Sequence, residues 1–125
     1  MKQKRFSIQK RLQSIHFALH GLKILIRDEH NARIHLIAAI VVLISGILFR
    51  ISVTDWIAII FAIGLVLAIE IINTTIERIA DFISPEKQEA IKKIKDLSAA
   101  SVLIAAITAL IIGLFVFIPK ILKIC

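Results

Sequence analysis

The chain has 125 residues, of which 58% are hydrophobic, and it carries 16 basic against 9 acidic residues for a net charge of +7. Long apolar blocks alternate with short charged stretches, which excludes an ordinary soluble domain and indicates a single membrane domain. The single cysteine, Cys125, excludes an internal disulfide and a cysteine-rich metal site. Few glycines and prolines interrupt the apolar blocks, so the predicted fold is all-α rather than a membrane barrel.

The first predicted element is an amphipathic helix over residues 8–27. Its apolar side chains fall within an arc of about 80° at about 100° per residue, and they are Ile8, Leu12, Ile15, Leu19, Leu22 and Ile26. The other faces are polar and basic, which suits a helix lying in the headgroup region of a membrane. Packing against a partner helix is the alternative interpretation.

Three transmembrane helices are predicted to follow, over residues 34–49, 56–72 and 97–118. Of the 16 basic residues, 8 precede the first span and 5 lie between the second and third, whereas 1 and 2 lie on the other side. Because basic residues remain cytoplasmic, the N-terminus is expected inside and the C-terminus outside.

The last span contains a stripe of small residues, in which Ser101, Ala105, Ala109 and Gly113 recur every four positions. This stripe predicts close helix packing in lipid, with a contact between subunits as one use. Three spans and one surface helix offer little material to enclose a polar site, so we expect a homo-oligomer.

Polar residues cluster at the end of the second span. On a helix, Glu70, Asn73, Thr74, Glu77 and Asp81 share one face. Carboxylates stacked a turn apart repel unless a proton or cation intervenes, and oxygen ligands at this density suit Mg²⁺ bridged to substrate phosphates. A structural polar seam between helices is the alternative interpretation.

Two further segments bear on the chemistry. The pair Asp28-Glu29 stands at the depth where Glu77 should emerge, so the acids can meet. The stretch between the last two spans mixes cations for phosphate with acceptors for metal or ribose, although a solvated cytoplasmic loop would look similar.

The sequence also excludes several kinds of site. It has no glycine-rich phosphate loop and no protein-kinase motif, so any nucleotide site must be built otherwise. His16 and His20 are spaced for a metal but lack a third ligand. Lipid headgroups explain the basic residues beside the spans, so nucleic acid is not an expected partner.

The run Glu70-Ile-Ile-Asn73-Thr74-Thr75-Ile76-Glu77, followed by Asp81, resembles the signature of prokaryotic diacylglycerol kinases. The pair Gly21-Leu22, Glu29 before Arg33, and the pair Lys95-Asp96 extend the resemblance over roughly residues 10–118. It implies transfer of the γ-phosphate of MgATP to the hydroxyl of a membrane lipid. It also implies a homotrimer in the bacterial inner membrane, with sites shared between subunits at the cytoplasmic boundary. Residues 112–120 are similar to the undecaprenol-kinase branch, so diacylglycerol and undecaprenol both remain expected substrates.

The resemblance also implies a role for individual residues. Glu70 would be the catalytic base, Glu29 and Glu77 the magnesium ligands, and Asn73 and Asp81 their support. The implied nucleotide contacts are Lys10, Phe17, Glu29, Glu77, Glu86, Lys87, Gln88, Lys95 and Asp96. The implied lipid contacts are Lys10, Asn31, Ala32, Arg33, Ile34, His35, Glu70 and Ala99. Phe17 stands where some members have a tyrosine, so one hydroxyl contact is expected to be lost.

A rival function of another class is a non-enzymatic transporter or channel subunit, in which Glu70, Glu77 and Asp81 form a proton or cation path. A path should place polar groups across the whole depth of the bilayer. The outer half of every predicted span is apolar, which favours the kinase.

Overall fold

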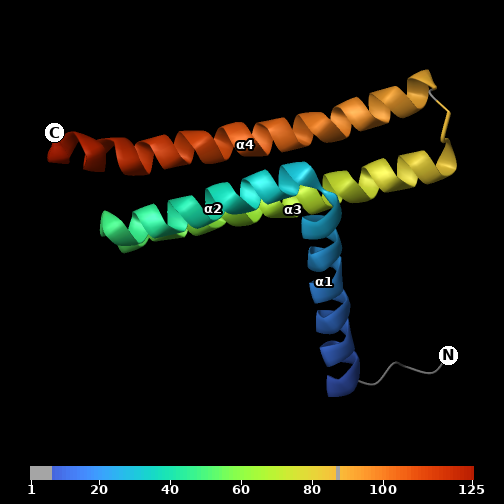
Figure 1. The fold of residues 1–125 in the computed structure, drawn as a ribbon, viewed down its shortest axis with the longest axis horizontal. Coiled ribbons are helices and arrows are strands. Elements are labelled where there is room, and N and C mark those ends of the chain that lie inside the picture. The colour runs from blue at the N-terminus through green and yellow to red at the C-terminus, as the bar shows by residue number, and fades with distance from the viewer. Residues whose placement is uncertain (1–6, 87) are drawn as a thin grey trace.

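The computed structural model describes residues 7–86 and 88–125. It contains four helices, α1 (Ile8–Asp28), α2 (His30–Leu48), α3 (Val53–Ile83) and α4 (Glu89–Ile124), and no strand occurs among the described residues. The helices α2, α3 and α4 lie side by side as an elongated bundle, and α1 projects from it at a steep angle (Figure 1). The all-α prediction is therefore confirmed.

Three of these helices are long and apolar enough to cross a membrane. The mean hydropathy of the most apolar window is 2.0 in α2, 2.4 in α3 and 2.9 in α4. The predicted spans lie within these helices, except that Phe49 is the C-cap of α2. Hydropathy thus identified the part of each helix that suits lipid, while the helices themselves run further.

The segment 78–96, expected as a connection, is mostly helical. α3 continues to Ile83 and α4 begins at Glu89, so the connection is confined to the few residues between them. On α4, Lys92 Nζ lies 2.8 Å from the Asp96 carboxylate and Lys93 Nζ lies 3.7 Å from that of Glu89. Such pairs at four-residue spacing support a helix outside the apolar region, which hydropathy does not detect.

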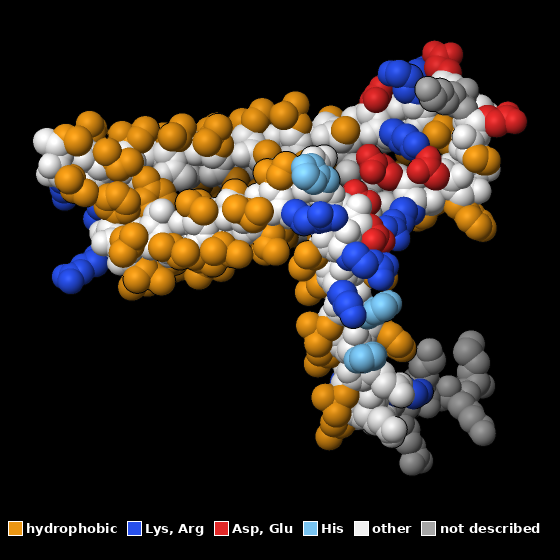
Figure 2. Space-filling model, in the orientation of Figure 1, with side chains coloured by type: hydrophobic (Ala, Val, Ile, Leu, Met, Phe, Trp, Pro, Cys, Tyr) orange, Lys and Arg blue, Asp and Glu red, His pale blue; other side chains and the backbone are white. Residues whose placement is uncertain are grey.

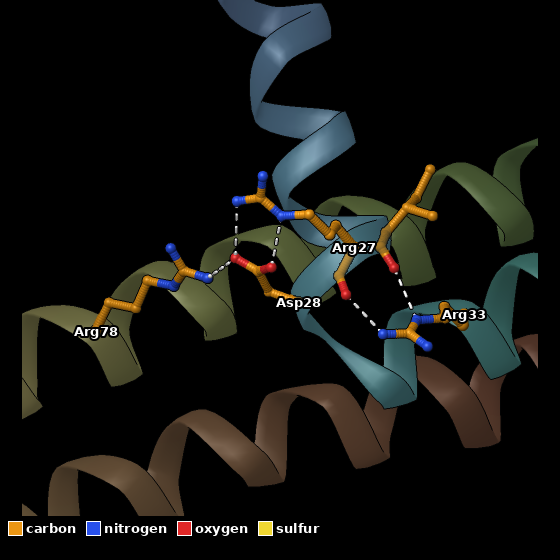
Figure 3. Close-up of polar contacts among 5 residues, drawn as sticks. Arg27, Asp28, Arg33 and Arg78 are labelled. Carbon is orange, nitrogen blue, oxygen red and sulfur yellow. Dashed lines mark hydrogen bonds and ion pairs between the residues drawn. The ribbon is translucent and has the colours of Figure 1, made fainter.

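The junction between α1 and α2 is a single extended residue, Glu29, with φ −109° and ψ 112°. Arg33, one turn into α2, donates from Nε to the carbonyl of Ile26 at 2.8 Å and from a terminal nitrogen to that of Arg27 at 2.6 Å (Figure 3). These bonds satisfy carbonyls that the end of a helix leaves without partners. The angle between α1 and α2 is therefore stabilised by Arg33.

The far end of the bundle is closed by a tight turn between α2 and α3. Arg50 adopts φ 53°, the Ile51 N–H donates to the Gly46 carbonyl at 3.2 Å, and the Arg50 N–H donates to that of Ile47 at 3.3 Å. This is the Schellman motif, in which the left-handed position is usually glycine. Ser52 then caps α3, because its Oγ accepts from the Asp55 N–H at 3.1 Å.

A small apolar core lies next to this turn. Ile51, Ile59 and Val116 are buried, and the rings of Phe49 and Phe117 meet edge to face with centroids 6.0 Å apart. This core joins α3 to the C-terminal half of α4 and to the end of α2.

Most apolar side chains of the spans remain exposed in the single chain. They cover much of the bundle, whereas most charged side chains on this face gather from the α1 junction to the connected ends of α3 and α4 (Figure 2). In α1 the hydrophobic side chains mostly line one side in this view and the basic ones the other. Residues 8–27 are helical as predicted, whereas the amphipathic character of this helix and its place on a membrane surface stay predictions.

The stripe of small residues in α4 faces the chain's own helices. Ala105 is buried, and Ala109 and Gly113 line a cavity between α2, α3 and α4. A further use of this stripe between subunits stays a prediction. The small side chain at Ala105 suits the packing of α4 on the rest of the chain, whereas nothing lies within 4 Å of a Cβ atom placed on Gly113.

Candidate active site

Glu70 is the most deeply buried acid of the site. It lies on α3 with 3% of its side chain exposed, and its Oε1 atom is 3.1 Å from Nε2 of His35 on α2. The two groups are not aligned for a hydrogen bond, so Oε1 is a buried oxygen without a hydrogen-bond partner among the described residues. A carboxylate in this state is costly unless a cation, a proton or a donor reaches it.

Two more carboxylates lie near Glu70. Glu29 at the α1–α2 junction and Glu77 on α3 are half-buried and close enough to act on Glu70 electrostatically. Within residues 7–86 and 88–125 neither of them forms a salt bridge with Lys or Arg. The expectation that Glu29 and Glu77 reach the same depth agrees with this arrangement.

The neighbouring acid Asp28 is used differently. Arg27 donates to it from Nε at 2.8 Å and Arg78 of α3 donates from a terminal nitrogen at 3.0 Å (Figure 3). These hydrogen bonds lower the pKa of Asp28 to about 2, and the bond from Arg27 has the largest effect. The two neighbouring acids therefore differ: Asp28 connects α1 to α3, and Glu29 lies near Glu70.

The polar face of α3 is also divided. Asn73 accepts a hydrogen bond from the Ser98 hydroxyl of α4 at 2.7 Å, and Asp81 forms an ion pair with Lys95. These contacts attach α3 to α4, while Glu70 and Glu77 remain unpaired with any Lys or Arg of the described chain. The sequence analysis did not identify Ser98 as part of this contact. It lies three residues before Ser101, the first member of the small-residue stripe.

The expected nucleotide contacts are not gathered in one place by the single chain. Lys95 pairs with Asp81, and Asp96 pairs with Lys92. Glu86 and Gln88 are exposed in the connection, and Lys87 lies outside the described residues. Lys10 and Phe17 precede Glu29 by 19 and 12 residues, which places them about 28 Å and about 18 Å away along α1.

The expected lipid contacts also point in different directions. In the stretch 31–35, Ala32 is buried, Arg33 binds the end of α1, and His35 contacts Glu70. Asn31, Ile34 and Ala99 are exposed. Consecutive helical residues surround the axis, so one chain does not present this stretch as a single surface.

The described side chains fit a magnesium ion that is bound together with a substrate. No group of three or more His, Cys, Asp or Glu side chains able to hold a metal occurs in the described part of the chain. Glu29 and Glu77 offer two carboxylates beside the unpartnered oxygen of Glu70. Mg²⁺ commonly takes one or two protein carboxylates together with substrate phosphates, so these residues fit a metal bound with a nucleotide.

The fold and site together define a helical membrane protein with a cluster of carboxylates that no Lys or Arg of the described residues pairs with. The family model of prokaryotic diacylglycerol kinase matches residues 16–117. The chain is 34% identical over 119 residues to the undecaprenol kinase of Bacillus subtilis (strain 168), covering 95% of this chain and 97% of that one. It is 28% identical over 113 residues to the diacylglycerol kinase of Synechocystis sp., covering 90% and 65%. The chain belongs to the prokaryotic diacylglycerol kinase family, a family of lipid kinases.

Proposed function

We propose that this protein transfers the γ-phosphate of MgATP to the hydroxyl of a membrane lipid, either undecaprenol or diacylglycerol. Undecaprenol is the first candidate, because the undecaprenol kinase is matched over nearly its whole length. The observation that carries the proposal is the buried Glu70 carboxylate, without a hydrogen bond on Oε1, beside Glu29 and Glu77.

In this proposal Glu70 is the general base. It accepts the proton of the lipid hydroxyl as that oxygen bonds to the γ-phosphorus, while the bond from phosphorus to the departing ADP breaks. Glu29 and Glu77 would hold Mg²⁺, which neutralises charge on the phosphates. The residues thus divide the work between proton acceptance and the binding of the metal with its nucleotide.

The position of Glu70 suits a substrate that stays in the bilayer. A cavity of about 420 Å³ lies between α2, α3 and α4, and every side chain lining it is apolar except His35, which contacts Glu70. A hydroxyl carried on an apolar chain can therefore approach the carboxylate without leaving an apolar surrounding, whereas the nucleotide approaches from the charged end.

We further propose a homotrimer in the bacterial inner membrane, with the N-terminus cytoplasmic and the C-terminus outside. The support is the distribution of Lys and Arg and the distance of Lys10 and Phe17 from Glu29 in one chain. Lys10 and Phe17, which lie far along α1 from the site of their own subunit, would contribute to the site of a neighbouring subunit.

The rival transporter has less support. The acids gather at one end of the bundle on the face in Figure 2, and the cavity within the spans is apolar apart from His35. A cation path would need polar groups along the whole depth.

The deciding experiment is an ATP-dependent phosphorylation assay of the purified protein in mixed micelles, with undecaprenol and diacylglycerol offered separately. We expect one lipid to be phosphorylated in a Mg²⁺-dependent reaction, and undecaprenol with the higher kcat/KM. Glu70→Gln is the control for contaminating kinases. Phosphorylation of neither lipid would refute the proposal, and preference for diacylglycerol would refute only the choice of lipid.

A further inference from the structure

The contact between His35 and Glu70 has a feature that a structural ion pair would not have. Oε1 of Glu70 is 3.1 Å from His35 Nε2, yet it is the buried side-chain oxygen without a hydrogen bond in the described part of the chain. The imidazole is 26% exposed and the carboxylate 3%. The two groups are close enough to bond and are not aligned.

Among the described residues, His35 is the basic group that contacts this carboxylate. Glu29 from the α1–α2 junction and Glu77 from α3 are carboxylates like Glu70, so neither offers it a positive charge. On α4 the nearby polar groups are engaged, because Ser98 donates to Asn73 and Lys95 pairs with Asp81. No Lys or Arg of the described residues forms a salt bridge with Glu70.

His35 also stands where the apolar cavity meets the carboxylate. It is the polar residue among the side chains that line the cavity between α2, α3 and α4. Its preceding neighbours in the stretch 31–35 point elsewhere, because Ala32 is buried and Arg33 binds the carbonyls of α1. The position of His35 therefore differs from that of the residues expected to share a lipid-binding role with it.

We propose that His35 is a positioning residue for Glu70. In this proposal the Nε2–H of His35 donates to Oε1 of Glu70, which turns the other oxygen of the Glu70 carboxylate toward the lipid hydroxyl. The proposal rests on the proposed function, since it assumes that Glu70 is the base. It differs from a lipid contact, because the effect of His35 would pass through Glu70. Alignment of such bonds often tightens only when substrate binds, which agrees with the unaligned contact in the free protein.

The test compares His35→Gln, which keeps a donor, with His35→Leu, which keeps bulk without a donor. We expect His35→Leu to lower kcat by about 10- to 100-fold, the range for lost orienting partners, with little change in the KM for lipid. His35→Gln should recover most of the kcat. The matched control is His20→Leu on α1, an exposed histidine outside the site, which should keep wild-type values.

A raised KM for lipid with unchanged kcat would overturn the proposal in favour of a lipid contact, and unchanged kinetics would also overturn it. Retained assembly and MgATP binding by His35→Leu would exclude misfolding as the cause of a lower kcat.

A second measurement does not depend on activity. The ¹⁵N NMR signal of His35 Nε2, identified by its loss in His35→Gln, should move in Glu70→Gln, and an unmoved signal would overturn the contact. If the wild-type protein phosphorylates neither lipid while this signal moves, the proposed function fails and the contact between His35 and Glu70 stands.

Discussion

The carboxylates of this chain differ in whether a basic side chain reaches them. Asp28, Asp81 and Asp96 each pair with Arg or Lys, and these pairs connect helices or turns of one helix. Glu29 and Glu77 pair with neither in the described chain. A carboxylate that is already neutralised has little capacity for a metal or a proton, so the unpaired acids are the candidates for chemistry.

Replacement of the acids by amides should separate a base from a metal ligand. Glu70→Gln is expected to lower kcat by about 100- to 10,000-fold and to leave MgATP binding intact, because the amide fills the space without accepting a proton. Glu77→Gln and Glu29→Gln should instead weaken Mg²⁺-dependent nucleotide binding, with partial recovery at higher metal concentration. Steady-state kinetics and nucleotide titrations at several Mg²⁺ concentrations measure both effects.

Near-normal turnover by Glu70→Gln, or normal MgATP binding by Glu77→Gln, would show that these roles are assigned wrongly. The resemblance to the family would then remain the support for a kinase.

The ion pairs of Asp28 should make stability depend on pH. Its pKa is about 2 in the folded protein, below the ordinary 3.8, because Arg27 and Arg78 donate to it. The folded state therefore favours the ionised acid, so the stabilisation is complete above about pH 4 and is lost as the pH falls toward 2. Wild-type protein in detergent should lose more thermal stability between pH 6 and pH 3 than Asp28→Asn.

Arg78→Gln should reduce the same pH dependence, because it removes the partner on α3. Equal pH dependence in the wild type and Asp28→Asn would mean that this acid does not stabilise the attachment of α1.

At the scale of elements, the turn between α2 and α3 depends on the absence of a side chain at Gly46. A Cβ atom there would lie 2.7 Å from Cη2 of Trp56 and 3.1 Å from Cδ1 of Ile51. Glycine to alanine in a helix normally stabilises by about 1 kcal/mol, but overpacking against a packed side chain costs about 1–3 kcal/mol, and Trp56 is partly buried against the core. The clash should prevail here, because both neighbours belong to the closed end of the bundle.

We therefore expect Gly46→Ala to lower the free energy of unfolding in detergent by about 1–2 kcal/mol. Gly64→Ala on α3 is the matched control, since nothing lies within 4 Å of its Cβ position. That variant should be neutral or up to about 1 kcal/mol more stable. A destabilised Gly64→Ala with an unchanged Gly46→Ala would contradict the packing of Trp56 on α2.

At the scale of the whole molecule, α1 leaves the bundle at a steep angle, so it extends beyond the reach of its own site (Figure 1). If Lys10 serves a neighbouring subunit, two inactive variants should complement each other. Glu70→Gln and Lys10→Glu are each expected to have strongly reduced activity alone. In a closed ring assembled from equal amounts of both variants, each shared site takes Glu70 from one subunit and Lys10 from its neighbour. Each of these residues is intact in half of the subunits, so about a quarter of the sites would contain both intact residues.

The measurement is kinase activity after the two variants are denatured together, refolded together and compared with separately refolded mixtures. Recovery to roughly a quarter of wild-type activity supports a shared site. No recovery would place Lys10 and Glu70 in the same subunit's site, or leave Lys10 outside the machinery.

Much of the fold could be predicted because it depends on local composition. Apolar blocks and helical period identified the first helix, the three spanning helices and the polar face around Glu70, Asn73 and Glu77. The helix ends were less predictable. The last turns of α3 and the first turns of α4 extend beyond the apolar parts of these helices. Ion pairs of their charged side chains stabilise these helical turns, and hydropathy does not detect such pairs.

The sequence by itself determined the all-α class, the membrane-spanning segments and the signature of the family, since these follow from residues that are close together in the chain. Only the tertiary structure decided that Asp28 binds Arg78, that Asp81 binds Lys95 and that Glu70 meets His35. Each of these contacts joins different helices. Their existence depends on helix angles and depths set by packing, which the period of a single helix does not contain.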